Sequence, residues 1–187
     1  MGTIPTPPTI VAGTSVGLAA QLNTMRDCVN FWANTPKCYA YQTAGVTLAN
    51  GTVTVLPLQA ELYDIVQAGD SPSHDNTTSN TRLVARTAGK YTISGTVSFA
   101  SNATGDRGAY VRLNAAGVAT GGTLLSTSRS AATAAGSLSV ANLPTIERDL
   151  AVGDYIELFA LQTAGGTLPT SATGSFDTWL SMRLSGQ

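Results

Sequence analysis

The sequence predicts an all-β protein, an antiparallel β-sandwich that follows an extended N-terminal arm and one short α-helix. Three observations carry this prediction. After Cys38, short runs in which apolar and polar residues alternate recur to the end of the chain. Clusters of Gly, Asn, Asp, Ser and Pro separate these runs, as is typical of turns. A helical period occurs in one stretch only, between Thr14 and Ala33.

Residues 1–13 form the predicted arm. Its three prolines fix the backbone φ angle and bias the residues before them towards extended geometry. An arm of this kind is disordered in the free protein or docks along a partner in an assembly. We therefore expect an arm and docking helix at residues 1–38, followed by the sandwich domain at residues 39–187.

The predicted helix carries one apolar stripe, which we name the apolar seam. Its residues are spaced four, three, four and three apart, as in a coiled coil: Leu18, Leu22, Met25, Val29 and Trp32. Such a helix packs on its own domain, on another subunit or on a docking partner. Because a closed β-sandwich needs no additional helix to complete its core, we expect quaternary use and assign the seam to docking on a larger particle.

Residues 13–17 spell G-x-S-x-G, the pattern of a hydrolase nucleophile turn. A hydrolase also needs a parallel sheet, an acid and a histidine that activates the serine. The one histidine, His74, lies in a polar, loop-like segment, and no alternation of strands and helices follows. We therefore expect Ser15 to cap the helix, and we expect no enzyme activity.

The stretch from Ala88 to Asn114 organises the sandwich. Its first part places apolar side chains on one side of an extended chain and Thr or Ser on the other, the period of a half-buried strand. A second alternating run follows a turn-rich segment without a helix between them, which predicts that the two strands pair antiparallel. Upstream, Asn50-Gly51 predicts a tight hairpin between its flanking runs.

Three pieces of the chain together carry a family resemblance. They are a Gly-x-Tyr strand opening at Gly89, the strand 150–158 with the pattern L-x-x-GD-x-I-x-L, and a closing aromatic strand at residues 175–184. In this order they resemble the C1q and tumour-necrosis-factor family, although Asp177-Thr178 stands where the family usually has Ser-Gly. The resemblance covers roughly residues 40–187, and it implies a jelly roll that assembles as a trimer.

The strand after Asp154 is apolar on both faces. Tyr155, Phe159 and Leu161 occupy one face, whereas the other face is also apolar. One face of each sheet in a two-layer sandwich ordinarily meets water, so something must cover the second. A loop or the N-terminal helix is one candidate cover. We favour a subunit interface, and we assign these three residues to the trimer contact.

Charge and composition exclude several classes of partner. Charged residues make up 11% of the chain and the formal net charge is -1, so nucleic acid and anionic membranes are unsuitable partners. No apolar run is long enough to span a membrane, and the first nine residues lack a secretory signal pattern. We expect synthesis in the cytoplasm and no membrane insertion.

Metal and redox chemistry are also not expected. Cys28 and Cys38 are too few for a disulfide framework or a four-ligand zinc site, and we expect buried, idle thiols. Several loop aspartates, Asp64, Asp70 and Asp75 among them, offer oxygen atoms, but their spacing fits no calcium loop. We expect no cofactor and no metal.

These features favour a structural protein of a tailed-phage virion. A trimeric jelly-roll knob would decorate the capsid or form a head-fibre tip, and residues 1–38 would anchor it to the major capsid or tail protein. The alternative is a tail-fibre or minor tail module whose loops recognise a host surface glycan or protein. Both rest on the low-charge composition rich in Thr, Ala and Gly and on analogy of architecture.

Overall fold

The computed structural model describes residues 18–174 and 177–186 of the 187-residue chain. This part of the chain holds one helix, α1 (Leu18–Ala33), and thirteen strands. The strands are β1 (Lys37–Tyr41), β2 (Thr47–Leu48), β3 (Thr54–Val55), β4 (Ala60–Ile65), β5 (Arg82–Val84), β6 (Gly89–Phe99), β7 (Asp106–Leu113), β8 (Thr123–Ala131), β9 (Ser139–Asn142), β10 (Ile146–Leu150), β11 (Tyr155–Gln162), β12 (Leu168–Pro169) and β13 (Trp179–Gly186).

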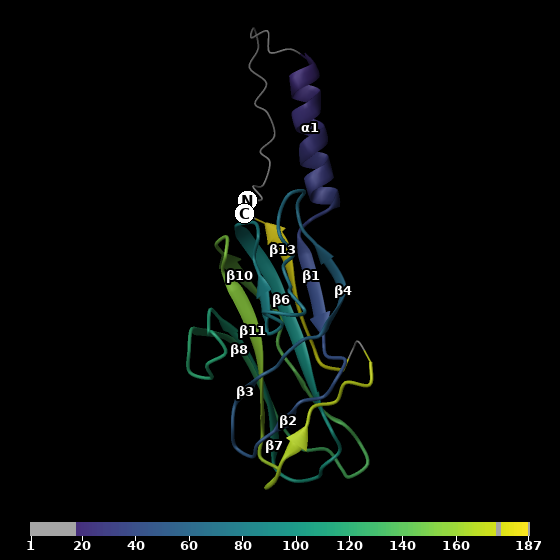
Figure 1. Ribbon diagram of the computed structural model, residues 1–187, viewed down its shortest axis with the longest axis vertical. Helices are drawn as coiled ribbons and strands as arrows, with labels where there is room; N and C mark the ends of the chain where they lie inside the picture. Colours follow the sequence, from purple (N-terminus) through teal and green to yellow (C-terminus); the bar gives the residue numbers. More distant parts are fainter. Residues whose placement is uncertain (1–17, 175–176, 187) are drawn as a thin grey trace.

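The strands form the two layers of an antiparallel sandwich, and α1 extends beyond one end of it (Figure 1). One sheet has six strands in the order β10-β6-β13-β1-β4, with β9 also paired to β6. The other has five strands in the order β3-β11-β7-β8, with β5 also paired to β11. A small β12-β2 pair lies apart from both. The predicted fold class, an all-β jelly roll behind one short helix, is confirmed.

The core lies between the two sheets. Alternate residues of the six-stranded sheet point into it, among them Cys38, Ala40, Ile93, Leu180 and Met182. Ile156, Leu158 and Ala160 of β11 meet them from the other sheet. Burial of each large side chain in this layer, such as Ile93 or Leu180, contributes roughly 1.5–3 kcal/mol to the driving force for folding.

Two strand-pairing predictions are wrong. Strands β6 and β7 follow one another in sequence, but β6 pairs with β13 and β7 pairs with β11, in opposite sheets. The chain therefore crosses the sandwich at this loop, as a jelly roll requires, and does not form a hairpin. Likewise Asn50-Gly51 makes a turn, with Gly51 at a φ of 72°, but its flanking strands β2 and β3 pair elsewhere.

The Gly-Asp pair that carried the family resemblance forms the turn into β11. Gly153 has a φ of 93°, which favours glycine. The Asp154 carboxylate accepts hydrogen bonds from the Ala151 N–H at 2.8 Å and from the Asn114 side chain at 2.8 Å. This short sequence thus fixes the start of β11 and ties it to the end of β7.

Helix α1 meets the sandwich at its C-terminal end. Phe31 belongs to the buried core cluster, and Thr35 Oγ1 donates a hydrogen bond to the Trp32 carbonyl at 2.8 Å after the last turn. Strand β1 begins at Lys37, directly after Pro36, so the sheet starts two residues before the domain boundary predicted from the sequence. Within the described residues, no helix is long and apolar enough to cross a membrane.

Candidate functional site

Strand β11 was expected to need a partner subunit, but its own chain covers it. Phe159 is fully buried in the single chain, and Leu161 is 8% exposed. Phe159 lies opposite Val55 of β3 on one side and Tyr110 of β7 on the other, so neighbouring side chains flank it within the same sheet. The prediction that these residues form an open trimer contact is therefore corrected.

Tyr155, the third residue assigned to that contact, is held in a polar cluster. The Arg82 guanidinium lies 4.3 Å from its ring centroid, and its hydroxyl accepts a hydrogen bond from the Ala116 N–H at 3.1 Å. The neighbouring Glu157 is fully buried and contacts Arg82 at 3.3 Å and the Gly117 N–H at 3.0 Å. The loop after β7 thus lies over β11, which is the alternative cover considered for this strand.

The apolar seam of α1 is open. Leu22 is 54% exposed, Met25 51%, Val29 66% and Trp32 46%. The side chain of Leu18, the first seam residue, lies outside the described residues, as do the arm and the G-x-S-x-G segment. Four bulky apolar side chains in one stripe are costly to leave in water, so the seam is a candidate contact surface. Its assignment to particle docking stays a prediction.

A second open surface is the side of the six-stranded sheet that points away from the core. We name it the outward face. It alternates with the core residues along each strand, and it consists of Lys37, Tyr39, Tyr41, Tyr63, Thr92, Ser94, Thr96, Glu147, Asp149, Trp179, Ser181 and Arg183. Small hydroxyl side chains occupy its centre, which leaves it nearly flat.

Aromatic rings gather at one side of the outward face. Tyr39 stacks on Trp179, with ring centroids 4.9 Å apart, and its ring lies 5.9 Å from that of Tyr63. The Lys37 ammonium lies 5.5 Å from the Tyr63 ring centroid. Tyr39 is buried beneath its neighbours, and burial raises the pKa of its phenol well above the ordinary value. Aromatic residues with one polar end are enriched at protein interfaces.

Charge is distributed unequally across the outward face. One register row runs from Lys37 of β1 through Arg183 and Thr92 to Glu147 of β10. Asp149 lies two residues further along β10 and is also exposed. The face thus carries Lys37, Arg183 and the aromatic rings towards β1, and Glu147 and Asp149 on β10, where Lys90 of β6 lies opposite Asp149.

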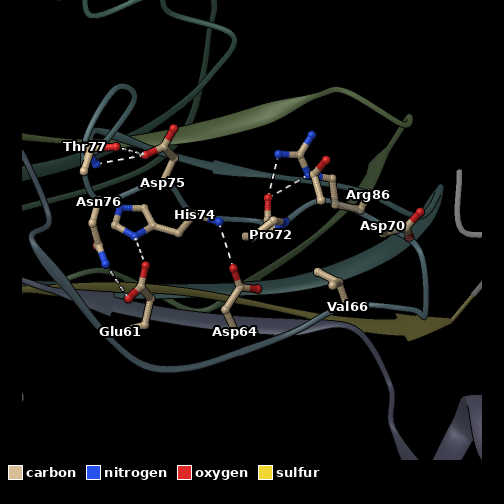
Figure 2. Close-up of a pocket in the computed structure, with 11 residues that line it drawn as sticks. Glu61, Asp64, Val66, Asp70, Pro72, His74, Asp75, Asn76, Thr77 and Arg86 are labelled. Carbon is tan, nitrogen blue, oxygen red and sulfur yellow. Dashed lines mark hydrogen bonds and ion pairs between the residues drawn. The ribbon is translucent and has the colours of Figure 1, made fainter.

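A hollow of about 760 Å³ lies beside the polar loop after β4 (Figure 2). His74 is 3% exposed, and its Nδ1 lies 2.6 Å from a Glu61 carboxylate oxygen. The second Glu61 oxygen accepts a hydrogen bond from the Asn76 side chain at 2.8 Å. The Arg86 guanidinium donates to the Pro72 carbonyl at 2.6 Å. The polar groups of the hollow thus bond to one another and shape the loop.

Asp64 lines this hollow, and Cys38 of β1 is its register partner. The Asp64 carboxylate accepts a hydrogen bond from the His74 N–H at 2.9 Å, and burial raises its pKa. Burial and the nearby carboxylates raise the pKa of the Cys38 thiol well above its ordinary range, so the thiol stays protonated. Cys28 and Cys38 are both free and buried, as expected. Among residues 18–174 and 177–186, no group of three or more His, Cys, Asp or Glu side chains is placed to hold a metal ion.

Arg107 is a buried charge that the sequence analysis missed. It is fully buried, and it donates hydrogen bonds to the carbonyls of Thr104, Asp106 and Asn102 at 3.0, 3.0 and 2.8 Å. Burial lowers the pKa of its guanidinium. Its place at the start of β7, after a turn-rich segment, was visible in the sequence. Its function is structural, because its bonds fix the loop that crosses between the sheets.

No model of a known protein family matches the sequence, and no curated protein matches it. Solved structures do match. A crystal structure of murine APRIL at pH 5.0 has a TM-score of 0.59 at 12% identity, covering 81% of this chain and 99% of that one. Eiger TNF from S. frugiperda has a TM-score of 0.57 at 10% identity, covering 82% and 94%. At these identities the likeness shows the fold, a jelly roll of the tumour-necrosis-factor type.

Proposed function

We propose that this chain is a structural protein of a virion, a homotrimeric jelly-roll head that decorates the capsid or ends a head fibre. Residues 1–38 anchor the head to the major capsid or tail protein. The observation that carries this proposal is the position of α1, which extends beyond the sandwich (Figure 1) and whose apolar seam is exposed. Apart from Phe31 in its last turn, no described side chain of α1 belongs to the core cluster, so its exposed seam serves attachment or assembly.

The outward face supports the trimer. Its aromatic edge carries Arg183 and its opposite edge carries Glu147, whose register partner is the uncharged Thr92, so two copies match best head to tail, with Arg183 of one facing Glu147 of the next. In a head-to-tail pair, one edge of each copy stays uncovered. Closure of a ring covers these remaining edges. A closed ring of three flat faces would place the stacked Tyr39 and Trp179 between subunits.

The chemistry of the described residues fits a structural role better than a catalytic one. His74 is buried, and both of its ring nitrogens lie within hydrogen-bond distance of protein groups, the Glu61 carboxylate and the Asn80 carbonyl. The Cys38 thiol is held protonated. A general base or nucleophile needs access to a substrate, and these groups lack it.

Two measurements test the proposal. Light scattering behind a sizing column should give about three times the 19.1 kDa chain mass for the purified protein. Antibodies raised against that protein should label particles of the virus that encodes it, at regular capsid or tail positions. Absence of the chain from purified particles would overturn the virion function. A monomeric mass would overturn the trimer.

The second candidate is a tail-fibre module that binds a host surface glycan or protein. The hollow near Asn76 and Arg86 favours it, because carboxylate, amide, hydroxyl and guanidinium groups converge there, as in polar ligand sites (Figure 2). Thr77→Ala with Asn76→Ala should then abolish adhesion of the purified protein to host cells while the oligomeric mass stays unchanged. Unaltered adhesion would exclude this hollow as the binding site.

A further inference from the structure

The apolar seam of α1 faces away from the side on which the helix contacts its own head. Phe31 is buried in the core cluster and Cys28 is also buried, whereas the seam residues are exposed. At 100° per residue, Phe31 lies about 140° around the helix from the centre of the seam. The last turn of α1 therefore contacts the head through Phe31, and the seam is left open to another molecule.

We infer that the seam packs against the same seam of two other copies of this chain, so that three α1 helices form a short parallel bundle on the axis of the head. The inference rests on the proposed trimer and deepens it. It assigns Leu22, Met25, Val29 and Trp32 to contacts between copies, in place of the docking contact expected from the sequence. Attachment to the particle then falls to the residues before Leu18.

The chemistry of the seam favours identical partners. Its four-three spacing is that of helices that pack against helices with the same spacing. The charged residues of α1 are Arg26 and Asp27; both lie off the seam and pair with one another at 3.1 Å. In a symmetric bundle, identical residues face one another, so a charged seam would repel its own copies. The seam carries no charge and avoids this repulsion.

The seam is also continuous with the outward face of the head. Trp32, the last seam residue, lines a groove of about 520 Å³ together with Tyr63, Ser94, Ser181 and Arg183 of the outward face. A copy that covers the outward face therefore reaches the end of the seam without a gap. The two open surfaces form one strip along the molecule, and a single kind of partner covers both.

The length of α1 explains why the head is needed. Sixteen residues hold little more than two heptads, too few for an autonomous coiled coil in water. Three heads joined around an axis would hold their helices side by side at an effective concentration on the order of millimolar, which removes most of the association cost. The bundle then stabilises the same trimer that makes it possible.

Cross-linking of the free protein tests the inference directly. In the test variant, Cys28→Ser leaves the buried Cys38 as the one native thiol, and Met25→Cys adds a thiol on the seam. Identical seam positions meet near the axis of a parallel bundle, so mild oxidation of the dilute trimer should yield disulfide-linked dimers in most chains. The matched control is Asn23→Cys, an exposed position off the seam on the same helix. It should cross-link at least tenfold less.

A second pair of variants measures the contribution of the bundle to the trimer. Leu22→Asp with Val29→Asp should raise the protein concentration at which the trimer dissociates at least tenfold. The control, Asn23→Asp with Asn30→Asp, adds the same charge at exposed positions of α1 that lie off the seam. It should leave the dissociation concentration of the trimer unchanged.

The outcomes separate the two proposals. A trimer in which Met25→Cys does not cross-link and the seam aspartates have no effect would overturn the bundle and leave the proposed function intact. If the variant with the seam aspartates stays trimeric but no longer binds particles, the seam is a contact with the particle and not with other copies. A monomer at all concentrations would overturn both the bundle and the trimeric head.

Discussion

The phenol ring of Tyr39 stacks on the indole of Trp179, with ring centroids 4.9 Å apart and an interplanar angle of 19°. The two residues lie on neighbouring strands β1 and β13, and both belong to the outward face. Stacking fixes both rings in one orientation before any partner arrives. A surface that is already ordered loses less side-chain entropy on association, so this part of the face is suited to a permanent contact.

Tyr63 lies at the edge of this aromatic cluster, and Tyr63→Asp should dissociate the trimer. The substitution removes the ring that packs beside Tyr39 and places a carboxylate against an apolar contact, where the loss of its hydration is costly. Light scattering should then report the 19.1 kDa chain mass, while circular dichroism reports an unchanged fold. The control is Val118→Asp, an exposed apolar position in the loop over the other sheet. A Tyr63→Asp trimer of normal stability would remove the outward face from the interface.

A charge exchange tests the head-to-tail arrangement. Arg183→Glu should weaken the trimer, and so should Glu147→Arg, because each places like charges opposite one another. The double variant should recover much of the lost association, since opposite charges face one another again. Sedimentation at several protein concentrations measures the recovery. Arg148→Glu, on the opposite side of β10, serves as the control. Additive losses in the double variant would exclude this pairing.

Phe159→Ala should destabilise the single chain and not the contact between copies. Removal of a fully buried phenylalanine costs about 3–5 kcal/mol, through lost burial and the cavity left behind. Urea unfolding at low protein concentration measures this loss. The mass of the fraction that remains folded should equal that of the unchanged protein. A stable, monomeric Phe159→Ala variant would restore β11 to the interface.

The stability of the head should depend on Asp177 in acid. Hydrogen bonds from the Thr173 hydroxyl at 2.5 Å, the Thr173 N–H at 2.8 Å and the Ser171 hydroxyl at 3.1 Å lower the pKa of this carboxyl. Because the folded state holds the carboxylate more strongly than the unfolded state, its stabilising effect is present above about pH 4 and disappears as the pH falls through the lowered pKa.

Asp177→Asn should therefore lower the melting temperature at pH 7 and reduce its decline below pH 4. Thermal unfolding of both proteins between pH 7 and pH 2 measures this. Asp75→Asn is a useful comparison, because hydrogen bonds from Thr78 and Thr77 also hold the pKa of Asp75 well below its ordinary value. Parallel curves for the Asp177→Asn variant and the unchanged protein would mean that its hydrogen bonds do not persist in solution.

The sequence predicted elements with a strong local period well. Period-two alternation located β6, β7 and β11, and the four-three spacing located α1. The partners of these strands could not be predicted in the same way. Strand β6 pairs with β13 from the far end of the chain, and alternation within a strand carries no information about its neighbour.

For the candidate interface, too, the sequence predicted the element but not its partners. The two apolar faces of β11 were recognised, but their cover was assigned to the wrong molecule. Val55 and Tyr110 flank Phe159 from strands distant in sequence, and the loop at Gly117 lies over Glu157. Gly117 has a φ of 73°, a geometry that favours glycine, and this loop of small residues gave no apolar signal of its own. The outward face was missed because Cys38 and Ala40 make β1 apolar on both sides.

Strand β13 lies between β1 and β6 in the six-stranded sheet, and all three strands pair along most of their length. During synthesis β1 and β6 leave the ribosome well before β13 does. Until β13 pairs with them, β1 and β6 each expose an open backbone edge, which is a template for pairing with other chains. The sheet thus closes only after β13 has been made, and the outward face does not exist before that moment. A prematurely terminated chain would therefore retain α1 and two unpaired edges, and would aggregate rather than assemble.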